Sequence, residues 1–153
     1  MAIDNKQLAK RIFEDVWTKG KIELIEELVD PGFQGQDPML GTINRDALRE
    51  AVKGYRAAFP DLKFEVNNVI AEGNAVVVRW TARGTNRGPL MGMQATGKSA
   101  VVTGLDYQEI RNGKIVSQHA EFDALGMLRQ LGVDAGAMPQ PSTRQGVETG
   151  KRT

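Results

Sequence analysis

The 153-residue sequence contains no cysteine and only one histidine, His119. The absence of cysteine excludes disulfides, thiolate zinc sites and a cysteine nucleophile. With one histidine, only scattered carboxylates remain as metal ligands, and such a set does not build a common transition-metal site. The sequence therefore predicts a protein without a bound metal or cofactor.

An excess of charge and long apolar runs are also missing. Twenty basic residues stand against nineteen acidic ones, which gives a net charge of +1. No basic patch is dense enough for nucleic acid, no run approaches the ~20 apolar residues that cross a bilayer, and the N-terminus lacks a signal-peptide core. We expect a cytoplasmic protein with neither a nucleic-acid nor a membrane partner.

The order of periodic segments predicts an α+β fold in one domain, residues 1–132. Apolar residues recur at helical spacing before Pro60, with Asn44 as a helix cap, whereas alternation typical of strands follows Pro60. Expected helices cover about 4–20, 22–29, 44–59 and 124–131, and expected strands cover 33–37, 62–72, 75–83, 99–111 and 113–123. Residues 133–153 are poor in apolar side chains, so we expect a flexible C-terminal tail.

One segment, Gly92–Ser99, satisfies the phosphate-loop expression G-x-x-x-x-G-K-S. That loop requires a buried strand before it and a helix after it, so that a helix N-terminus faces the phosphates. Here the following residues alternate like a strand. The sequence therefore predicts a turn that enters a strand, not a nucleotide site.

The stretch from Gly113 to Gly132 holds the main candidate for chemistry. His119 lies four residues before Asp123, where strand spacing gives way to the helix that starts at Ala124. Because side chains alternate along a strand, His119 and Asp123 share one face and would open into the same cavity. The chemistry predicted for this pair is proton transfer.

Asp123 also has a structural interpretation. Aspartate is a favoured N-cap, and its carboxylate would then accept backbone N–H bonds from the first helical turn. Those bonds lower the pKa of a carboxyl and weaken it as a base, whereas catalysis needs an apolar, partly desolvated site. Both interpretations stay open at this point.

Two further strands carry candidate pocket residues. Trp80 shares a strand face with Val78 and is expected in the core or a cavity wall, opposite Arg79. Asp106 lies mid-strand on the face opposite Tyr107, which makes it a second polar cavity candidate or a residue on an exposed sheet face.

Several short motifs together resemble the SnoaL-like polyketide cyclase family, also called ester cyclases, of the nuclear-transport-factor-2-like superfamily. These motifs are Phe59-Pro60-Asp61, Arg79-Trp80-Thr81, residues 84–88 (GTNRG), residues 96–98 (TGK), and residues 113–115 (GKI) leading to Asp123 and residues 130–132 (QLG). The resemblance spans roughly residues 8–132. It implies a cone-shaped, curved antiparallel sheet wrapped by three N-terminal helices, with a short C-terminal helix, an apolar pocket and a homodimer.

The resemblance also implies a site. An aspartate acts as general base in cofactor-free intramolecular aldol ring closure in characterised members, and Asp123 resembles that residue. Two positions depart from the pattern: Asn86 stands where many relatives have histidine, and His119 stands where they have tryptophan. Besides Asp123 and His119, the residues expected around the pocket are Trp80, Tyr107, Asp106, Phe33, Tyr55, Phe59 and Asn86.

Three functions remain in view. The first is a cyclase or isomerase acting on an apolar small molecule, in which Asp123 removes a proton α to a carbonyl and His119 orients it or returns a proton. The second is epoxide hydrolysis by Asp123, Asp106 and Arg79 on one cavity wall. The third is a non-catalytic pocket that only holds an apolar ligand.

Overall fold

The computed structural model describes residues 4–134 and residue 136, so nearly all of the expected tail lies outside the described residues. Helices precede the main strands, and a short helix closes the domain. The helical elements are α1 (Asn5–Arg11), the π-helical η1 (Ile12–Thr18), the 3-10 turn η2 (Ile22–Leu24), α2 (Ile25–Leu28), α3 (Arg45–Ala58) and α4 (Ala124–Leu131). The strands are β1 (Val29–Asp37), β2 (Gly41–Asn44), β3 (Lys63–Glu72), β4 (Ala75–Thr85), β5 (Ser99–Arg111) and β6 (Lys114–Phe122).

Local sequence explains where α3 begins. The Asn44 side chain accepts a hydrogen bond from the Ala47 backbone N–H at 2.8 Å, which satisfies one of the free donors of the first turn. Leu48 and Val52, one turn apart, are both buried. The predicted cap and core-facing side of this helix are confirmed.

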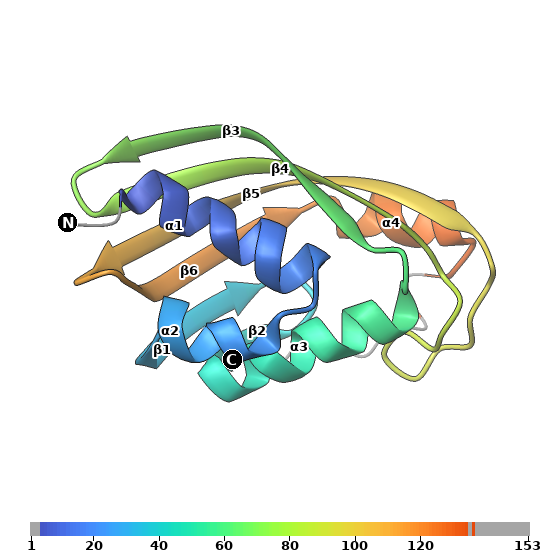
Figure 1. The fold of residues 1–153 in the computed structure, drawn as a ribbon. Helices are drawn as coiled ribbons and strands as arrows, with labels where there is room; N and C mark the ends of the chain where they lie inside the picture. The colour runs from blue at the N-terminus through green and yellow to red at the C-terminus, as the bar shows by residue number, and fades with distance from the viewer. Residues whose placement is uncertain (1–3, 135, 137–153) are drawn as a thin grey trace, which may run out of the picture.

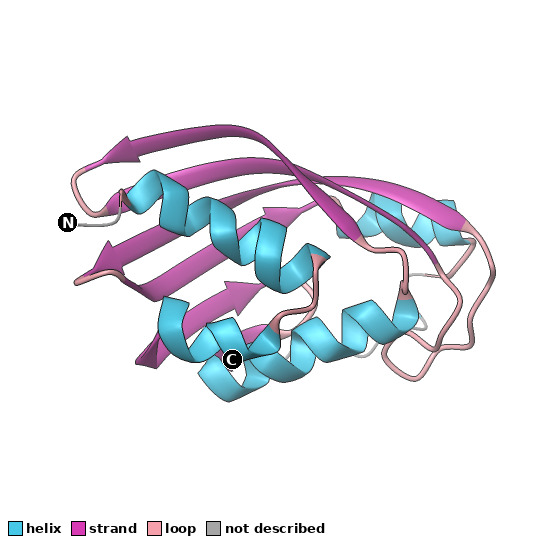
Figure 2. Cartoon of the chain, viewed as in Figure 1, coloured by secondary structure: helices cyan, strands magenta, loops and turns pink. Residues whose placement is uncertain are grey.

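The α+β fold contains one sheet of six strands in the order β2-β1-β6-β5-β4-β3 (Figure 2). Neighbouring strands are antiparallel except β1 and β6, which are parallel. The expected all-antiparallel sheet is therefore wrong at this one pair, because the first strand enters the sheet beside the last, a long-range pairing that local alternation does not encode. The sheet is curved and unclosed, since its end strands β2 and β3 do not pair with each other.

The helices cover the inner face of this sheet. Helices α1 and η1 pack against β3, while α3 packs against β1 and β2 (Figure 1). Strand β4 shows the alternation that results: Val78 and Trp80 are buried on the inner face, whereas Arg79 between them is exposed. The outer face of the sheet remains uncovered within the described chain.

Helix α4 protects the edge that β6 leaves open. Strand β6 ends at Phe122, opposite Gly104, so the first residues of β5 lack a partner on that side. The Gln130 side chain accepts from Val101 N at 2.8 Å and donates to Val101 O at 2.9 Å, as a paired strand would. This contact fixes α4 beside β5 and covers an edge prone to unwanted pairing.

The phosphate-loop-like motif can be placed directly in the fold. The phosphate-loop-like segment runs straight into β5 at Ser99, as predicted, with a strand where a nucleotide loop needs a helix.

In the part of the chain that the structure describes, none of the helices has the length and apolar character needed to cross a membrane.

Candidate active site

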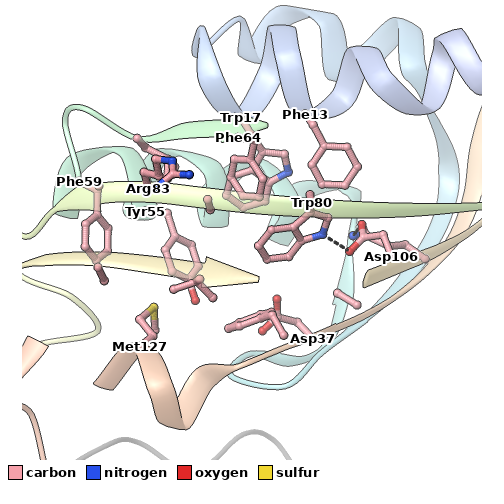
Figure 3. A pocket seen from close by; sticks show the side chains of 18 residues that line it. Phe13, Trp17, Asp37, Tyr55, Phe59, Phe64, Trp80, Arg83, Asp106 and Met127 are labelled. Atoms are coloured by element: carbon pink, nitrogen blue, oxygen red, sulfur yellow. Dashed lines mark hydrogen bonds between the residues drawn. The ribbon is translucent and has the colours of Figure 1, made fainter. Parts of the chain in front are cut away.

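A cavity lies between the inner face of the sheet and the elements η1, α3 and α4 (Figure 3). It offers about 90 Å³ to the centre of a water-sized molecule, which is room for several waters or part of a small organic ligand. All but two of the chain's aromatic side chains line it, the exceptions being Phe33 and Tyr107. The lining is otherwise mostly aliphatic, so an apolar, planar ligand fits it best.

The aromatic wall is a set of rings in mutual contact. Phe64 meets Trp80 with ring centroids 4.9 Å apart and Trp17 at 5.5 Å, and Trp80 also meets Phe122 at 6.0 Å. Gly104 lies opposite Trp80 in the β4–β5 register, and a Cβ there would come within 2.3 Å of the indole. The glycine therefore creates the space in which the Trp80 ring lies across β5.

Asp106 is the most buried acid of the cavity, with 1% of its surface exposed. Its Oδ1 accepts from Trp80 Nε1 at 3.3 Å, and its Oδ2 accepts from the Gln118 side-chain amide. Burial raises the pKa of Asp106 to about 7, although these donors favour the ionised form. A proton is therefore held in an apolar cavity up to neutral pH.

Asp37, at the end of β1, is the second carboxyl in the cavity lining. Its Oδ1 accepts from Met39 N at 2.8 Å and from Leu40 N at 3.0 Å, which fixes the carboxyl in the turn between β1 and β2. Burial raises the pKa of Asp37, while the two backbone N–H groups oppose that shift. The charge of Asp37 in turn raises the pKa of Asp106, so the two acids are coupled.

Four of the residues predicted around the pocket line the cavity: Trp80, Asp106, Tyr55 and Phe59. The other three, Tyr107, Phe33 and Asn86, lie elsewhere.

Tyr107 is 51% exposed on the outer face of β5, because it alternates with the inward-facing Asp106 and Gln108. Phe33 is buried in the hydrophobic core. The prediction that Tyr107 and Phe33 line the pocket is wrong. Strand alternation directs the Tyr107 ring to the outer face, and core packing directs the Phe33 ring away from the cavity.

Asn86 holds the loop between β4 and β5. Its Oδ1 accepts from Thr96 N at 2.8 Å, and its Nδ2 donates to Gly88 O at 2.9 Å. The side chain is buried, and these bonds satisfy it within the loop. Its predicted place in the pocket is wrong, because the loop backbone takes up both ends of the amide.

The structure also places His119 and Asp123 outside the cavity. Asp123 is exposed and caps α4, its Oδ1 accepting from Gly126 N at 2.9 Å. His119 is half-exposed on the outer face of β6, with Nε2 2.8 Å from Glu121 Oε1. The predicted alternation along β6 is correct, but the opposite face, which carries Gln118 and Phe122, lines the cavity. The prediction that His119 and Asp123 open into one cavity is therefore wrong.

The arrangement required for epoxide hydrolysis is absent as well. It needs Asp123, Asp106 and Arg79 on one cavity wall, yet Arg79 is exposed on the outer face of β4 and Asp123 caps a helix. Only Asp106 of the three lines the cavity.

Sequence reasoning missed Asp37 as a site residue. An acid directly before a proline at the end of a strand was the available signal, because Pro38 ends the strand and leaves Asp37 as its last residue, beside the following turn. Among residues 4–134 and 136, no three histidine, aspartate or glutamate side chains are grouped to hold a metal. The polar groups of the cavity are acids, an amide and a phenol, which suit proton transfer and hydrogen bonding.

A family model described as SnoaL-like polyketide cyclase matches residues 7–131. The chain belongs to the SnoaL-like polyketide cyclase family. The resemblance inferred from the short motifs is thus confirmed over most of the chain. No curated protein matches the chain significantly.

Solved structures share the fold. A protein from Jannaschia sp. CCS1 assigned as a SnoaL-like polyketide cyclase has a TM-score of 0.78 and 22% identity, covering 85% of this chain and 92% of its own. IdmH from Streptomyces antibioticus, assigned as a polyketide cyclase, has a TM-score of 0.75 and 26% identity, covering 86% and 100%. A Catenulispora acidiphila protein with a ketosteroid isomerase-like fold has a TM-score of 0.73 and 16% identity, covering 87% and 98%. This SnoaL-like chain therefore has the nuclear-transport-factor-2-like, or ketosteroid isomerase-like, fold.

Proposed function

We propose that this chain is a cofactor-free acid–base enzyme that removes a proton from carbon next to a carbonyl group in an apolar, planar small molecule. One observation carries the proposal: two coupled carboxyls, Asp37 and Asp106, lie in one cavity that is otherwise mostly apolar and aromatic. Family membership supports a polyketide-cyclase-like role of this kind.

The two acids have different environments, and these assign their roles. Asp106 is fully buried, and its pKa of about 7 keeps it protonated below neutral pH. Asp37 keeps two backbone N–H bonds that favour its carboxylate. Pairs of acids whose pKa values are pushed apart commonly divide base and acid functions. Asp37 is therefore the base and Asp106 the acid.

An intramolecular aldol ring closure uses both roles. Asp37 takes the proton from the carbon, and the C–H electron pair forms the enolate. The enolate carbon then attacks a second carbonyl of the same molecule, a C–C bond forms, and the oxygen of that carbonyl takes the proton of Asp106. Acid–base assistance of this kind contributes ~10²–10⁴-fold, provided that the cavity excludes water. The ring-walled cavity supports that condition.

A binding pocket without catalysis is the second candidate. The observation that favours it is the hydrogen bonding of Asp106, whose oxygens already engage Trp80 and Gln118. In that case the acid would only anchor the cavity wall. A ligand would then bind without losing a proton.

The test follows the exchange of the acidic C–H protons of β-tetralone for deuterium in D₂O by NMR, with and without protein. We expect catalysed exchange whose rate rises with pH as Asp37 ionises, over a range above the usual one for an aspartate because burial raises the pKa of Asp37. Binding of β-tetralone with no catalysed exchange at any pH would contradict the enzyme and favour the binding pocket.

The outer sheet face is the proposed homodimer interface. Tyr107 and Leu105 on β5 are 51% and 48% exposed, and Ile70 on β3 is 62% exposed. Ile70 pairs with Val77, which pairs with Tyr107, so these apolar residues form a continuous row across the sheet. An uncovered apolar row of this kind favours self-association.

Leu105→Glu is expected to convert the dimer to monomer, because it places a charge beside this row, two residues from Tyr107 on the same face of β5. Sedimentation velocity at micromolar concentration measures the change. Leu125→Glu is the matched control, since Leu125 is equally exposed, at 48%, but lies on α4 away from the row. A wild-type monomer, or dissociation caused by Leu125→Glu instead, would contradict this interface.

A further inference from the structure

Gln108 is a buried amide beside the cavity that the proposed acid–base pair does not use. It follows Asp106 by two residues on β5, so both side chains point to the inner face of the sheet, and each residue is 1% exposed. Its amide lies within hydrogen-bonding reach of the Asp106 carboxyl. Asp106 lines the cavity and Gln108 does not, so the amide approaches the carboxyl from the side away from the cavity.

The oxygen of this amide is left without a partner. Gln108 Oε1 is buried and accepts no hydrogen bond from any group in the described part of the chain. A buried acceptor without a donor destabilises a fold, and such groups are rare in native proteins. An apolar side chain at this position would avoid that cost. The free oxygen is therefore a candidate for a use that depends on its neighbour Asp106.

The protonated form of Asp106 needs an acceptor for its O–H group. Trp80 Nε1 donates to Oδ1 and cannot accept, and the Gln118 amide donates to Oδ2. These donors suit the carboxylate, whereas burial favours the neutral acid and raises its pKa. The Gln118 amide faces the cavity, but Gln108 offers a buried acceptor that no other group engages.

We propose that the Gln108 side-chain amide is a two-way partner of Asp106, donating N–H to the carboxylate and turning to accept the O–H of the protonated carboxyl with Oε1. This inference rests on the proposed function, in which Asp106 gives up and regains a proton. The two ends of an amide are nearly equal in size, so the turn needs little space. It breaks no other hydrogen bond of Oε1 within the described residues.

In the proposed ring closure, this amide stabilises both states of the acid. The developing alkoxide is a stronger acceptor than an amide oxygen, so the O–H bond of Asp106 rotates toward it. The proton moves to the alkoxide, and its electron pair stays on the carboxylate. Gln108 then turns and donates N–H to this new charge, which is costly in an apolar cavity without donors. Because it acts through Asp106, Gln108 is a positioning residue.

The other titratable side chains that line the cavity are Asp37 of β1, Tyr55 of α3 and Arg83 of β4. Burial raises the pKa of Asp106 most, and the charge of Asp37 adds a further rise. The guanidinium of Arg83 is more than half exposed and is directed toward Glu65. These groups are the same in each variant compared, so their effects on Asp106 are common to all.

NMR of the free protein can follow the orientation of the amide. We expect a nuclear Overhauser effect between the Gln108 amide protons and the Trp80 indole N–H at about pH 8.5, when both groups donate to the carboxylate, and its loss at about pH 5. In Asp106→Asn, which does not titrate, the effect should not change with pH. Equal intensity at both pH values in wild type overturns the proposal.

Two leucine variants compare the amides that contact Asp106. Gln118→Leu removes a donor to the carboxylate, so the titration midpoint of Asp106, followed by the ¹³C shift of its carboxyl, should rise by ~1–2 pH units. Gln108→Leu removes a partner of both protonation states and should raise the midpoint by less than about half as much. A rise in Gln108→Leu as large as that in Gln118→Leu identifies a fixed donor and overturns the proposal.

Neither measurement uses a substrate, so failure of this inference can be told apart from failure of the proposed function. Absence of β-tetralone exchange together with a pH-dependent turn of Gln108 contradicts the enzyme and supports the two-way amide. Catalysed exchange with an amide that keeps one orientation supports the enzyme and overturns the two-way amide.

Discussion

Replacing Asp37 by asparagine is expected to lower the rate of α-proton exchange by ~10²–10⁴-fold. Asparagine cannot accept the substrate proton, but its side-chain oxygen can still accept from Met39 N and Leu40 N, so the turn after β1 survives. The free energy of unfolding should therefore change little while catalysis is lost. NMR exchange rates and chemical denaturation of the same variant measure the two effects.

Asp123→Asn is the matched control, because it makes the same substitution at an acid outside the cavity. Asparagine caps helices about as well as aspartate, so both the exchange rate and the stability should stay near wild type. Asp123→Ala removes the cap and should cost about 1 kcal/mol of stability. Loss of exchange in Asp123→Asn with retention in Asp37→Asn would reverse the assignment of the base.

Asp106 should make the protein less stable as the pH rises toward neutrality. Burial raises the pKa of its carboxyl to about 7 in the folded state, compared with 3.8 in an unfolded chain. Between those values the folded state binds more protons than the unfolded state, so raising the pH favours unfolding. The stabilisation of the folded state by the proton on Asp106 is full below about pH 4 and is lost progressively up to about pH 7. The loss over this range amounts to about 4 kcal/mol of the free energy of unfolding.

Asp106→Asn should remove this dependence, since an amide of the same size does not ionise. Denaturation curves between pH 4 and pH 8 are expected to show a stability difference between variant and wild type that moves in favour of the variant as the pH rises. Taking this difference cancels the contributions of groups common to both proteins. Parallel stability curves for the two proteins would show that Asp106 does not hold a proton in the fold.

Asp37 and Asp106 lie in the same cavity, so the exchange and stability experiments probe one site. A carboxyl that stays protonated at pH 6 in an apolar cavity lowers stability at neutral pH, and an apolar side chain of similar size would avoid that cost. Such a cost is characteristic of a residue retained for function. The stability experiment therefore tests the acid of the proposed mechanism without a known substrate.

Local rules were sufficient for most elements of this protein. The Asn112-Gly113 turn has φ values of 51° and 74°, the geometry expected of a tight hairpin, and it places β5 beside β6. Asn44 begins α3, and Asp123 with Gly132 bound α4, because caps act on backbone groups within a few residues. Alternation also separated Asp106 from Tyr107 correctly.

Only the tertiary structure decided which of the two faces of a strand lines the cavity. Alternation in β6 divides His119 from Gln118 and Phe122 but is the same whichever face is turned inward. The direction of sheet curvature and the packing of η1 and α3 on one side make that choice, and they turn Phe122 in and His119 out. The same long-range packing inserts β1 beside β6 in parallel and brings Asp37 to Asp106, residues far apart in the chain. The sequence by itself determined most of the elements, though not β2, and the two faces of the strands it predicted. The pairing of the acids depended on contacts between distant segments, which local periodicity does not encode.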